Sequence, residues 1–205
     1  LDTKHPIIVE NLMGIRRVKG SIQKGKKPLL INHLKSIINV INEQKIEDIK
    51  KFRDKSIILV GFGGGFRRTE LISIDHEDLE FVPEGLKITI KRSKTDQFGE
   101  GMIKGLPYFD NETYCPIVNL KKWLEISKIK SGPIFRRFSK GLSLADKRLT
   151  DQSVVLLMKK YLNLAGIENK NFAGHSLRSG FATVAAESGA DERSIMAMTG
   201  HKTTQ

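Results

Sequence analysis

Apolar residues recur at helical spacing along most of the chain, and one stretch breaks this pattern by alternating as a β-strand does. The clearest helical stretch is 29–43, where the i, i+4, i+7, i+8, i+11 pattern of a buried helix face is filled by Leu30, Leu34, Ile37, Ile38 and Ile41. Similar patterns predict helices over 47–62, 116–126, 150–166 and 172–188, with a short helix after Asp191. We therefore expect a core of packed helices.

The alternating stretch lies at 78–95. Residues 78–82 alternate, Pro-Glu-Gly at 83–85 predicts a turn, and 86–90 alternate again. A third strand is predicted over 103–106, which gives a small antiparallel sheet that needs a helix to pack on. The predicted fold class is α+β and mostly helical, with a three-stranded antiparallel sheet carrying a lysine-rich hairpin loop. Residues 134–149 are predicted to be basic and irregular.

Three glycines at 63–65 precede Arg67 and Arg68. The segment lacks both the G-x-x-x-x-G-K-[ST] and the G-x-G-x-x-G spacing, so a nucleotide-binding loop is not predicted. Glycines permit a sharp turn and close backbone approach. We expect the turn to deliver both arginines to the start of a short helix, with Glu70 bracing Arg67.

His175 and Arg178 lie three residues apart in a predicted helix start at 172–181. At that spacing their side chains share one helix face. Histidine exchanges a proton near neutral pH, and the arginine fork fits a phosphate. The pair suits a phosphodiester, although taken alone a solvated helix face is the simpler explanation.

The charge balance favours a polyanionic partner. Lysine and arginine number 35 against 23 acidic residues, which gives a net charge of +12, and such a basic chain is expected to meet nucleic acid; the alternative is a protein that is merely rich in lysine. A basic linker at 21–28 includes Lys26 and Lys27, which are candidate DNA contacts. The single cysteine, Cys115, excludes an internal disulfide and fits a reducing, cytoplasmic setting, and no apolar run approaches the roughly 20 residues of a membrane span.

Four segments together resemble the tyrosine recombinases of the phage integrase type. They are Gly-Phe-Arg-Arg-Thr-Glu-Leu at 65–71, Arg-Ser-Lys-Thr-Asp-Gln at 92–97, His-Ser-Leu-Arg at 175–178 with Phe-Ala-Thr at 181–183, and Gly-His-Lys at 200–202. Their order and spacing match the family's arginine box, β-hairpin lysine box, His-x-x-Arg box and the box before the nucleophile. The resemblance covers about residues 29–205 and implies a helical catalytic domain there.

The resemblance also implies a mechanism. Arg67 and Arg178 would clamp the scissile phosphate, Lys94 would be the general acid, His175 would act in acid–base catalysis and His201 would donate a hydrogen bond. A tyrosine hydroxyl would attack to give a 3′-phosphotyrosyl link, with no cofactor and no metal. Rivals to Lys94 are Lys91, Arg92 and Lys104. Phosphate contacts outside the centre are assigned to Arg68, Arg92, Lys202, Lys26 and Lys27.

One departure from the family pattern concerns the nucleophile. Tyr108, Tyr114 and Tyr161 do not match its position, and the sequence ends at Gln205. We expect the tyrosine to follow, and residues 1–20 to be a remnant of an N-terminal DNA-binding domain. The fragment is then expected to be monomeric and to bind double-stranded DNA weakly without cleaving it, whereas the whole protein would form a homotetramer on paired sites. The alternatives are a type IB topoisomerase and an inactive DNA-binding relative.

Overall fold

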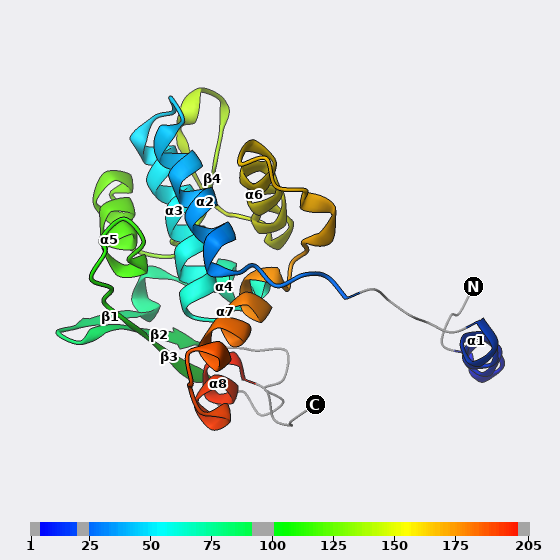
Figure 1. Cartoon of the computed structure of the whole chain (residues 1–205). Coiled ribbons are helices and arrows are strands. Elements are labelled where there is room, and N and C mark those ends of the chain that lie inside the picture. The colour runs from blue at the N-terminus through cyan, green and yellow to red at the C-terminus, as the bar shows by residue number, and fades with distance from the viewer. Residues whose placement is uncertain (1–4, 20–24, 92–100, 201–205) are drawn as a thin grey trace.

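The computed structural model describes residues 5–19, 25–91 and 101–200. Its helices form a cluster with a small sheet beneath one end (Figure 1), which confirms the predicted α+β, mostly helical class. The helices are α1 (Pro6–Lys19), α2 (Ile31–Glu43), α3 (Asp48–Gly63), α4 (Arg68–Ser73), α5 (Pro116–Ser127), α6 (Asp151–Leu164), α7 (Ser176–Glu187) and α8 (Glu192–Thr199).

The core is organised around α3, which lies between α2 and α5 (Figure 1). Most of α3 is buried, from Arg53 to Phe62, on every side of the helix. A helix covered all round loses a distinct apolar stripe. The charged Arg53 and Asp54 within its apolar run are tolerated because they pair with each other. Trp123 of α5 and Tyr161 of α6 are fully buried beside it.

The three-stranded sheet has the order β1-β2-β3, with β1 at Leu79–Val82, β2 at Gly85–Ile90 and β3 at Met102–Pro107. Both pairings are antiparallel, and Leu86 faces Leu106 while Ile88 faces Lys104. The side chains of these four residues are buried on the same face of the sheet. The predicted sheet is confirmed, and its β2 and β3 strands flank the lysine-rich segment.

Residues 134–149 correct the sequence-based expectation of an irregular stretch. They contain an antiparallel pair, β4 (Arg136–Phe138) and β5 (Leu144–Arg148). Two contacts stabilise the pair. The Arg53 guanidinium, which is distant in sequence, lies 4.4 Å from the Phe138 ring centroid. Between the strands, Arg136 Nη1 lies 2.6 Å from Asp146 Oδ1. Alternation alone could not reveal strands this short and charged.

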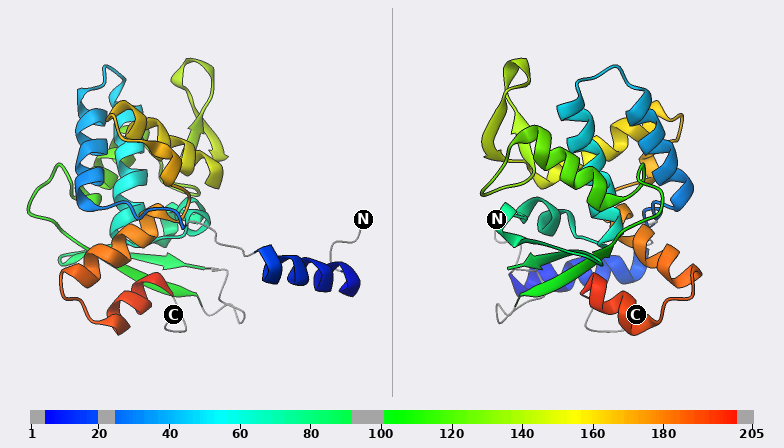
Figure 2. Two further views of the ribbon diagram at one scale, coloured as in Figure 1. Left: turned by 45° about the vertical axis from the view of Figure 1, so that its right-hand side comes forward. Right: turned by 90° about the vertical axis from the view of Figure 1, so that its left-hand side faces the viewer.

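Helix α1 lies apart from the rest of the described chain in Figure 1 and in the left view of Figure 2. Its exposed apolar side chains include Ile7, Met13, Ile15 and Val18. Within the described ranges, no helix combines the length and the apolar character needed to cross a membrane.

Candidate active site

The turn between α3 and α4 sets the position of Arg67. Gly65 adopts a left-handed φ of 54°, and a Cβ there would lie 2.7 Å from Cδ1 of Phe181, so both conformation and crowding require glycine. Helix α4 then begins with Arg67 as its N-cap. The Glu70 carboxylate accepts from the Arg67 backbone N–H at 3.0 Å and from Nη1 at 2.6 Å. Glu70 therefore braces Arg67 through both its backbone and its guanidinium.

The start of α7 brings His175 and Arg178 to one cavity. His175 occupies the N-cap position and is exposed, whereas Arg178 lies one turn later and is 5% exposed. Both line a hollow of about 320 Å³ together with Ser179, Ala182 and Thr183. The two predicted residues thus share a site, with the histidine at its rim and the arginine at its base.

Arg67 and Arg178 belong to one charge cluster, which we define as Arg67, Glu70, Lys104 and Arg178. Lys104 Nζ lies 3.6 Å from Glu70 Oε2, on the carboxylate that also holds Arg67. Arg178 Nη1 donates to the Gly65 carbonyl at 3.2 Å, and Lys104 Nζ lies within 3.2 Å of the same oxygen. Residues from α4, β3 and α7 therefore meet around the Gly64–Gly65 turn.

The charge cluster contains three cations and one carboxylate. Burial, followed by repulsion from Arg67, lowers the pKa of Arg178 to about 10. Its Nη2 is buried and has no hydrogen-bond partner in the described part of the chain. A buried N–H donor without a partner is destabilising, and excess positive charge makes an anion the complementary ligand. This arrangement is suited to holding a phosphate group.

The segment 25–30 runs along the start of α7. Ser176 Oγ donates to the Lys27 carbonyl at 2.8 Å, and the Leu29 backbone N–H donates to the Ser176 carbonyl at 2.8 Å. A Cβ on Gly180 would lie 2.0 Å from the Leu29 carbonyl oxygen, so glycine permits this crossing. Lys26 and Lys27 are exposed here, beside the helix that carries His175.

The remaining predicted residues are either partly exposed or outside the described residues. Arg68 Nε lies 3.3 Å from Asp151 Oδ2, and both side chains are more than a third exposed. Arg67 Nη2 donates to the Gly200 carbonyl at 3.4 Å, which brings the end of α8 against the cluster. The predictions for Lys94, Arg92, His201 and Lys202 fall outside the described residues.

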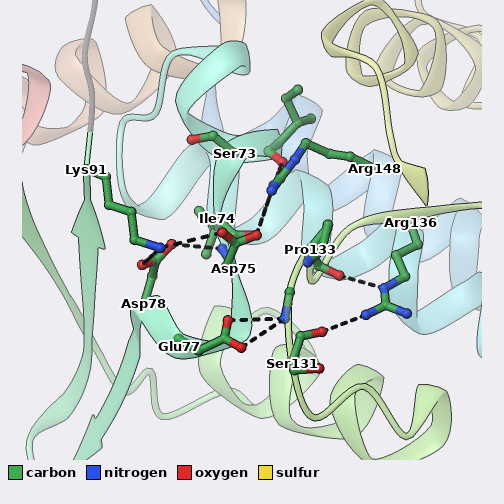
Figure 3. A network of polar contacts seen from close by, with 12 residues as sticks. Ser73, Ile74, Asp75, Glu77, Asp78, Lys91, Ser131, Pro133, Arg136 and Arg148 are labelled. Carbon is green, nitrogen blue, oxygen red and sulfur yellow. Dashed lines mark hydrogen bonds and ion pairs between the residues drawn. The ribbon is translucent and has the colours of Figure 1, made fainter. Parts of the chain in front are cut away.

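Lys91, a rival to Lys94, belongs to a network of polar contacts below the hairpin (Figure 3). Its Nζ lies 2.8 Å from Asp78 Oδ1 and 3.5 Å from Asp75 Oδ2, and the Asp78 contact raises the pKa of Lys91. Arg148 of β5 donates to Asp75 Oδ1 at 2.6 Å and to the Ile72 carbonyl at 2.6 Å. The network ties the end of β2 to the chain after α4 and to β5, so Lys91 is an anchor at the base of the hairpin.

The sequence indicated Lys104 only as a rival to Lys94, whereas the structure places it within the charge cluster. This side chain is fully buried, donates to the Gly64 carbonyl at 2.9 Å and lies 4.5 Å from the Phe66 ring centroid. The signal available in the sequence was a lysine inside a short alternating strand. Because lysine is almost never fully buried unless it is paired, a lysine on the buried face of such a strand indicates partners within the fold.

Comparison with known proteins places the chain in a family. Residues 28–205 match the family described as Phage integrase family. An integrase/recombinase XerD homolog from Selenomonas ruminantium is 44% identical over 191 residues, which are 93% of this chain and 55% of that protein. The chain spans about half the length of the curated relatives it matches.

Two solved structures share the fold. The XerH site-specific recombinase bound to palindromic difH substrate, in a post-cleavage complex, has a TM-score of 0.69 and 21% identity over 88% of this chain and 48% of that one. The Tn1549 transposon integrase in complex with circular intermediate DNA has a TM-score of 0.65 and 16% identity over 92% of this chain and 62% of that one. At these identities the likeness establishes the fold alone.

Proposed function

The chain belongs to the phage integrase family, and from this premise we propose that it is the catalytic part of a site-specific DNA recombinase. The reaction is cleavage and rejoining of phosphodiester strands through a 3′-phosphotyrosyl intermediate. Arg67 and Arg178 bind the non-bridging oxygens of the scissile phosphate. His175 acts in acid–base catalysis at the cavity rim.

The observation that carries this proposal is the convergence of Arg67 and Arg178 from distant segments beside an exposed histidine. The cluster has more cations than carboxylates, and Arg178 retains a buried donor without a partner among the described residues. Preorganised donors of this kind stabilise the charge that develops on a phosphorane in the transition state. Lys94 as general acid and His201 as hydrogen-bond donor complete the proposed centre.

We assign double-stranded DNA as the partner. Lys26 and Lys27 are exposed and Arg68 is partly exposed, and with Arg92 and Lys202 they are proposed to contact flanking phosphates. Such contacts fix the position of the duplex and carry no sequence information. The matched proteins are named recombinases and integrases, which does not favour the topoisomerase or inactive-relative alternatives.

The nucleophile is proposed to come from outside these 205 residues. Tyr161 is buried and donates to Asp54 Oδ2 at 2.7 Å, Tyr114 donates to Asn39 Oδ1 at 2.9 Å, and Tyr108 accepts from Lys121 at 2.6 Å. None of these tyrosines contacts the charge cluster. By itself the chain is then a DNA-binding monomer without cleavage activity, and the whole protein acts in the cytoplasm as a tetramer on paired sites.

The proposed organisation has three parts. Residues 1–20 end an N-terminal DNA-binding domain, 21–28 form the basic linker, and 29–205 form the catalytic domain. The exposed apolar side chains of α1 support the first assignment, since such a helix face requires a partner to bury it.

The test uses the longer protein that contains this segment and nicked duplexes carrying candidate recombination sites. Cleavage near the nick releases a short strand, so the covalent protein–DNA adduct accumulates. We expect an adduct in the unchanged protein, and a loss of about 10²–10³-fold in Arg178→Ala. Arg137→Ala, which removes an exposed arginine from β4, is the matched control and keeps the adduct.

The chain alone gives a second measurement, by fluorescence anisotropy on labelled duplex. We expect binding that weakens linearly on logarithmic axes as salt rises, because phosphate contacts release counterions. If binding is salt-sensitive but no candidate site gives an adduct, the enzyme proposal fails and the chain is instead a DNA-binding relative. Adduct formation by the 205-residue chain alone would overturn the assignment of an external nucleophile.

A further inference from the structure

Lys104 is a buried cation in a place where the β-sheet would ordinarily carry an aliphatic side chain. It is fully buried on β3, opposite Ile88 and two residues from the buried Leu106. A lysine in such a position loses hydration, and its retention requires compensating contacts. Its polar contacts are the Gly64 and Gly65 carbonyls and the Glu70 carboxylate.

Two of the contacts of Lys104 are shared with a catalytic arginine. Glu70, which lies 3.6 Å from Lys104 Nζ, is also the carboxylate that holds Arg67. The Gly65 carbonyl accepts from Lys104 at 3.2 Å and from Arg178 at 3.2 Å. Lys104 therefore contacts both the Glu70 carboxylate that holds Arg67 and the Gly65 carbonyl that holds Arg178.

The charge of Lys104 also matters to the substrate. With Lys104 protonated, the charge cluster has a net charge of two positive units; with Lys104 neutral, it has one. A phosphodiester carries one negative charge, and its pentavalent transition state carries two. When Lys104 is protonated, the two positive charges of the cluster therefore match the transition state better than the starting phosphodiester. Burial makes this electrostatic attraction stronger than it would be in water.

We propose that Lys104 is a positioning residue for phosphoryl transfer, which fixes Arg67 through Glu70 and Arg178 through the Gly65 carbonyl and must be protonated to do so. This inference rests on the proposed function of the cluster. Lys104 does not replace Lys94 as general acid, because its ammonium is enclosed and donates to the carbonyl oxygens of the Gly64–Gly65 turn.

The electrostatic setting supports a pH dependence in an accessible range. Burial lowers the pKa of Lys104 to about 8, with Glu70 opposing this shift and with Arg178 and Arg67 adding to it. No other titratable group contributes to the shift of this lysine in the described part of the chain. An anion bound between the arginines offsets their repulsion and raises the pKa again.

The first experiment measures Lys104 directly in the 205-residue chain, by ¹H–¹³C NMR of the lysine Cε groups, with Lys104→Met to assign its signal. We expect a titration midpoint well below that of the exposed lysines, and an upward movement of this midpoint when inorganic phosphate is added. A midpoint no lower than that of the exposed lysines, or one that phosphate leaves unmoved, would overturn the inference.

The second experiment measures single-turnover cleavage by the longer protein on nicked duplexes with oxygen or bridging sulfur at the 5′ leaving position. Sulfur leaves without a general acid, so it removes the contribution of Lys94. We expect Lys104→Met to be slower by about 10²-fold on both substrates, as misplacement of catalytic groups costs. On the sulfur substrate, the unchanged protein should also lose rate as Lys104 deprotonates, whereas the variant should show no such decline.

The outcomes separate the two proposals. Rescue of Lys104→Met by sulfur would make Lys104 a general acid and would overturn a positioning role, as would unchanged rates across the pH range. If the unchanged protein forms no adduct, the recombinase proposal fails, and the NMR response to phosphate alone decides the role of Lys104. Thermal unfolding of the variant verifies that it is folded in each case.

Discussion

Two groups of buried charged side chains in this protein are built in opposite ways. Arg53 and Asp54 of α3 form a balanced pair, in which Asp54 Oδ1 accepts from Nε at 2.9 Å and from Nη2 at 2.7 Å, and Oδ2 accepts from the Tyr161 hydroxyl. The charge cluster of Arg67, Glu70, Lys104 and Arg178 has three cations for one carboxylate and keeps a donor without a described partner.

The difference separates a structural role from a functional one. The Asp54 group joins α3, α6 and β4 and leaves no charge over, so it needs nothing from outside the fold. The charge cluster carries a surplus that only an anion balances. A buried ion pair contributes little to stability on average, but removal of one partner is strongly destabilising. The two groups should therefore respond to substitution in opposite ways.

The largest effect on stability is expected from Asp54→Asn. This change leaves the Arg53 guanidinium buried without its carboxylate, so the free energy of unfolding should fall by about 3–5 kcal/mol. Chemical denaturation of the 205-residue chain measures it. The double variant Arg53→Met with Asp54→Asn is the paired control and should recover part of the lost stability. If Asp54→Asn alone were as stable as the unchanged chain, the structural role assigned to the Arg53–Asp54 pair would be wrong.

Arg178→Met should show the reverse pattern. Loss of the preorganised donor should slow adduct formation by the longer protein by at least about 10²–10³-fold. The free energy of unfolding should be unchanged or higher, because a buried cation that others repel is removed. A fall in stability as large as that of Asp54→Asn would place Arg178 in the structural class.

Lys104→Met should sharpen the comparison through pH. In the folded chain the pKa of Lys104 is lowered from 10.5 to about 8, so between these values the unfolded chain binds more protons and stability rises with pH. The unfolding free energy of the unchanged chain, relative to that of Lys104→Met, should therefore increase by about 3 kcal/mol from neutral pH to above 10.5. Denaturation of both chains across this range measures it, and a constant difference would contradict the assigned burial cost.

The smallest effect on stability is expected from Lys91→Met. The side chain of Lys91 is 61% exposed, and exposed ion pairs contribute about 0–1 kcal/mol even with good geometry. Unfolding should change by less than about 1 kcal/mol. Cleavage should stay well above the level of Arg178→Met, because Lys91 anchors the base of the hairpin rather than the phosphate. Loss of cleavage as severe as in Arg178→Met would instead make Lys91 a member of the catalytic centre.

Much of the fold was predictable because it depends on local periodicity. The helices at 29–43, 116–126 and 150–166 were found by apolar spacing, and in the structure Thr150 caps α6 by accepting from the Ser153 N–H. The glycines at 63–65 correctly predicted a sharp turn before Arg67. The β4–β5 pair was missed because Phe138 and Arg136 are stabilised by Arg53 and Asp146, contacts that local pattern does not encode.

Sequence by itself determined the helical class, the net positive charge and the order of the family's motifs, since these depend only on residue types and their spacing. Tertiary structure decided which charges are shared. Strand neighbours point to opposite faces, so burial of Leu106 against the core also buries Lys104 and leaves Ile103 65% exposed, the reverse of their hydropathy. Only the packing of β3 beneath the Gly64–Gly65 turn turns that lysine into a neighbour of Glu70, Arg67 and Arg178.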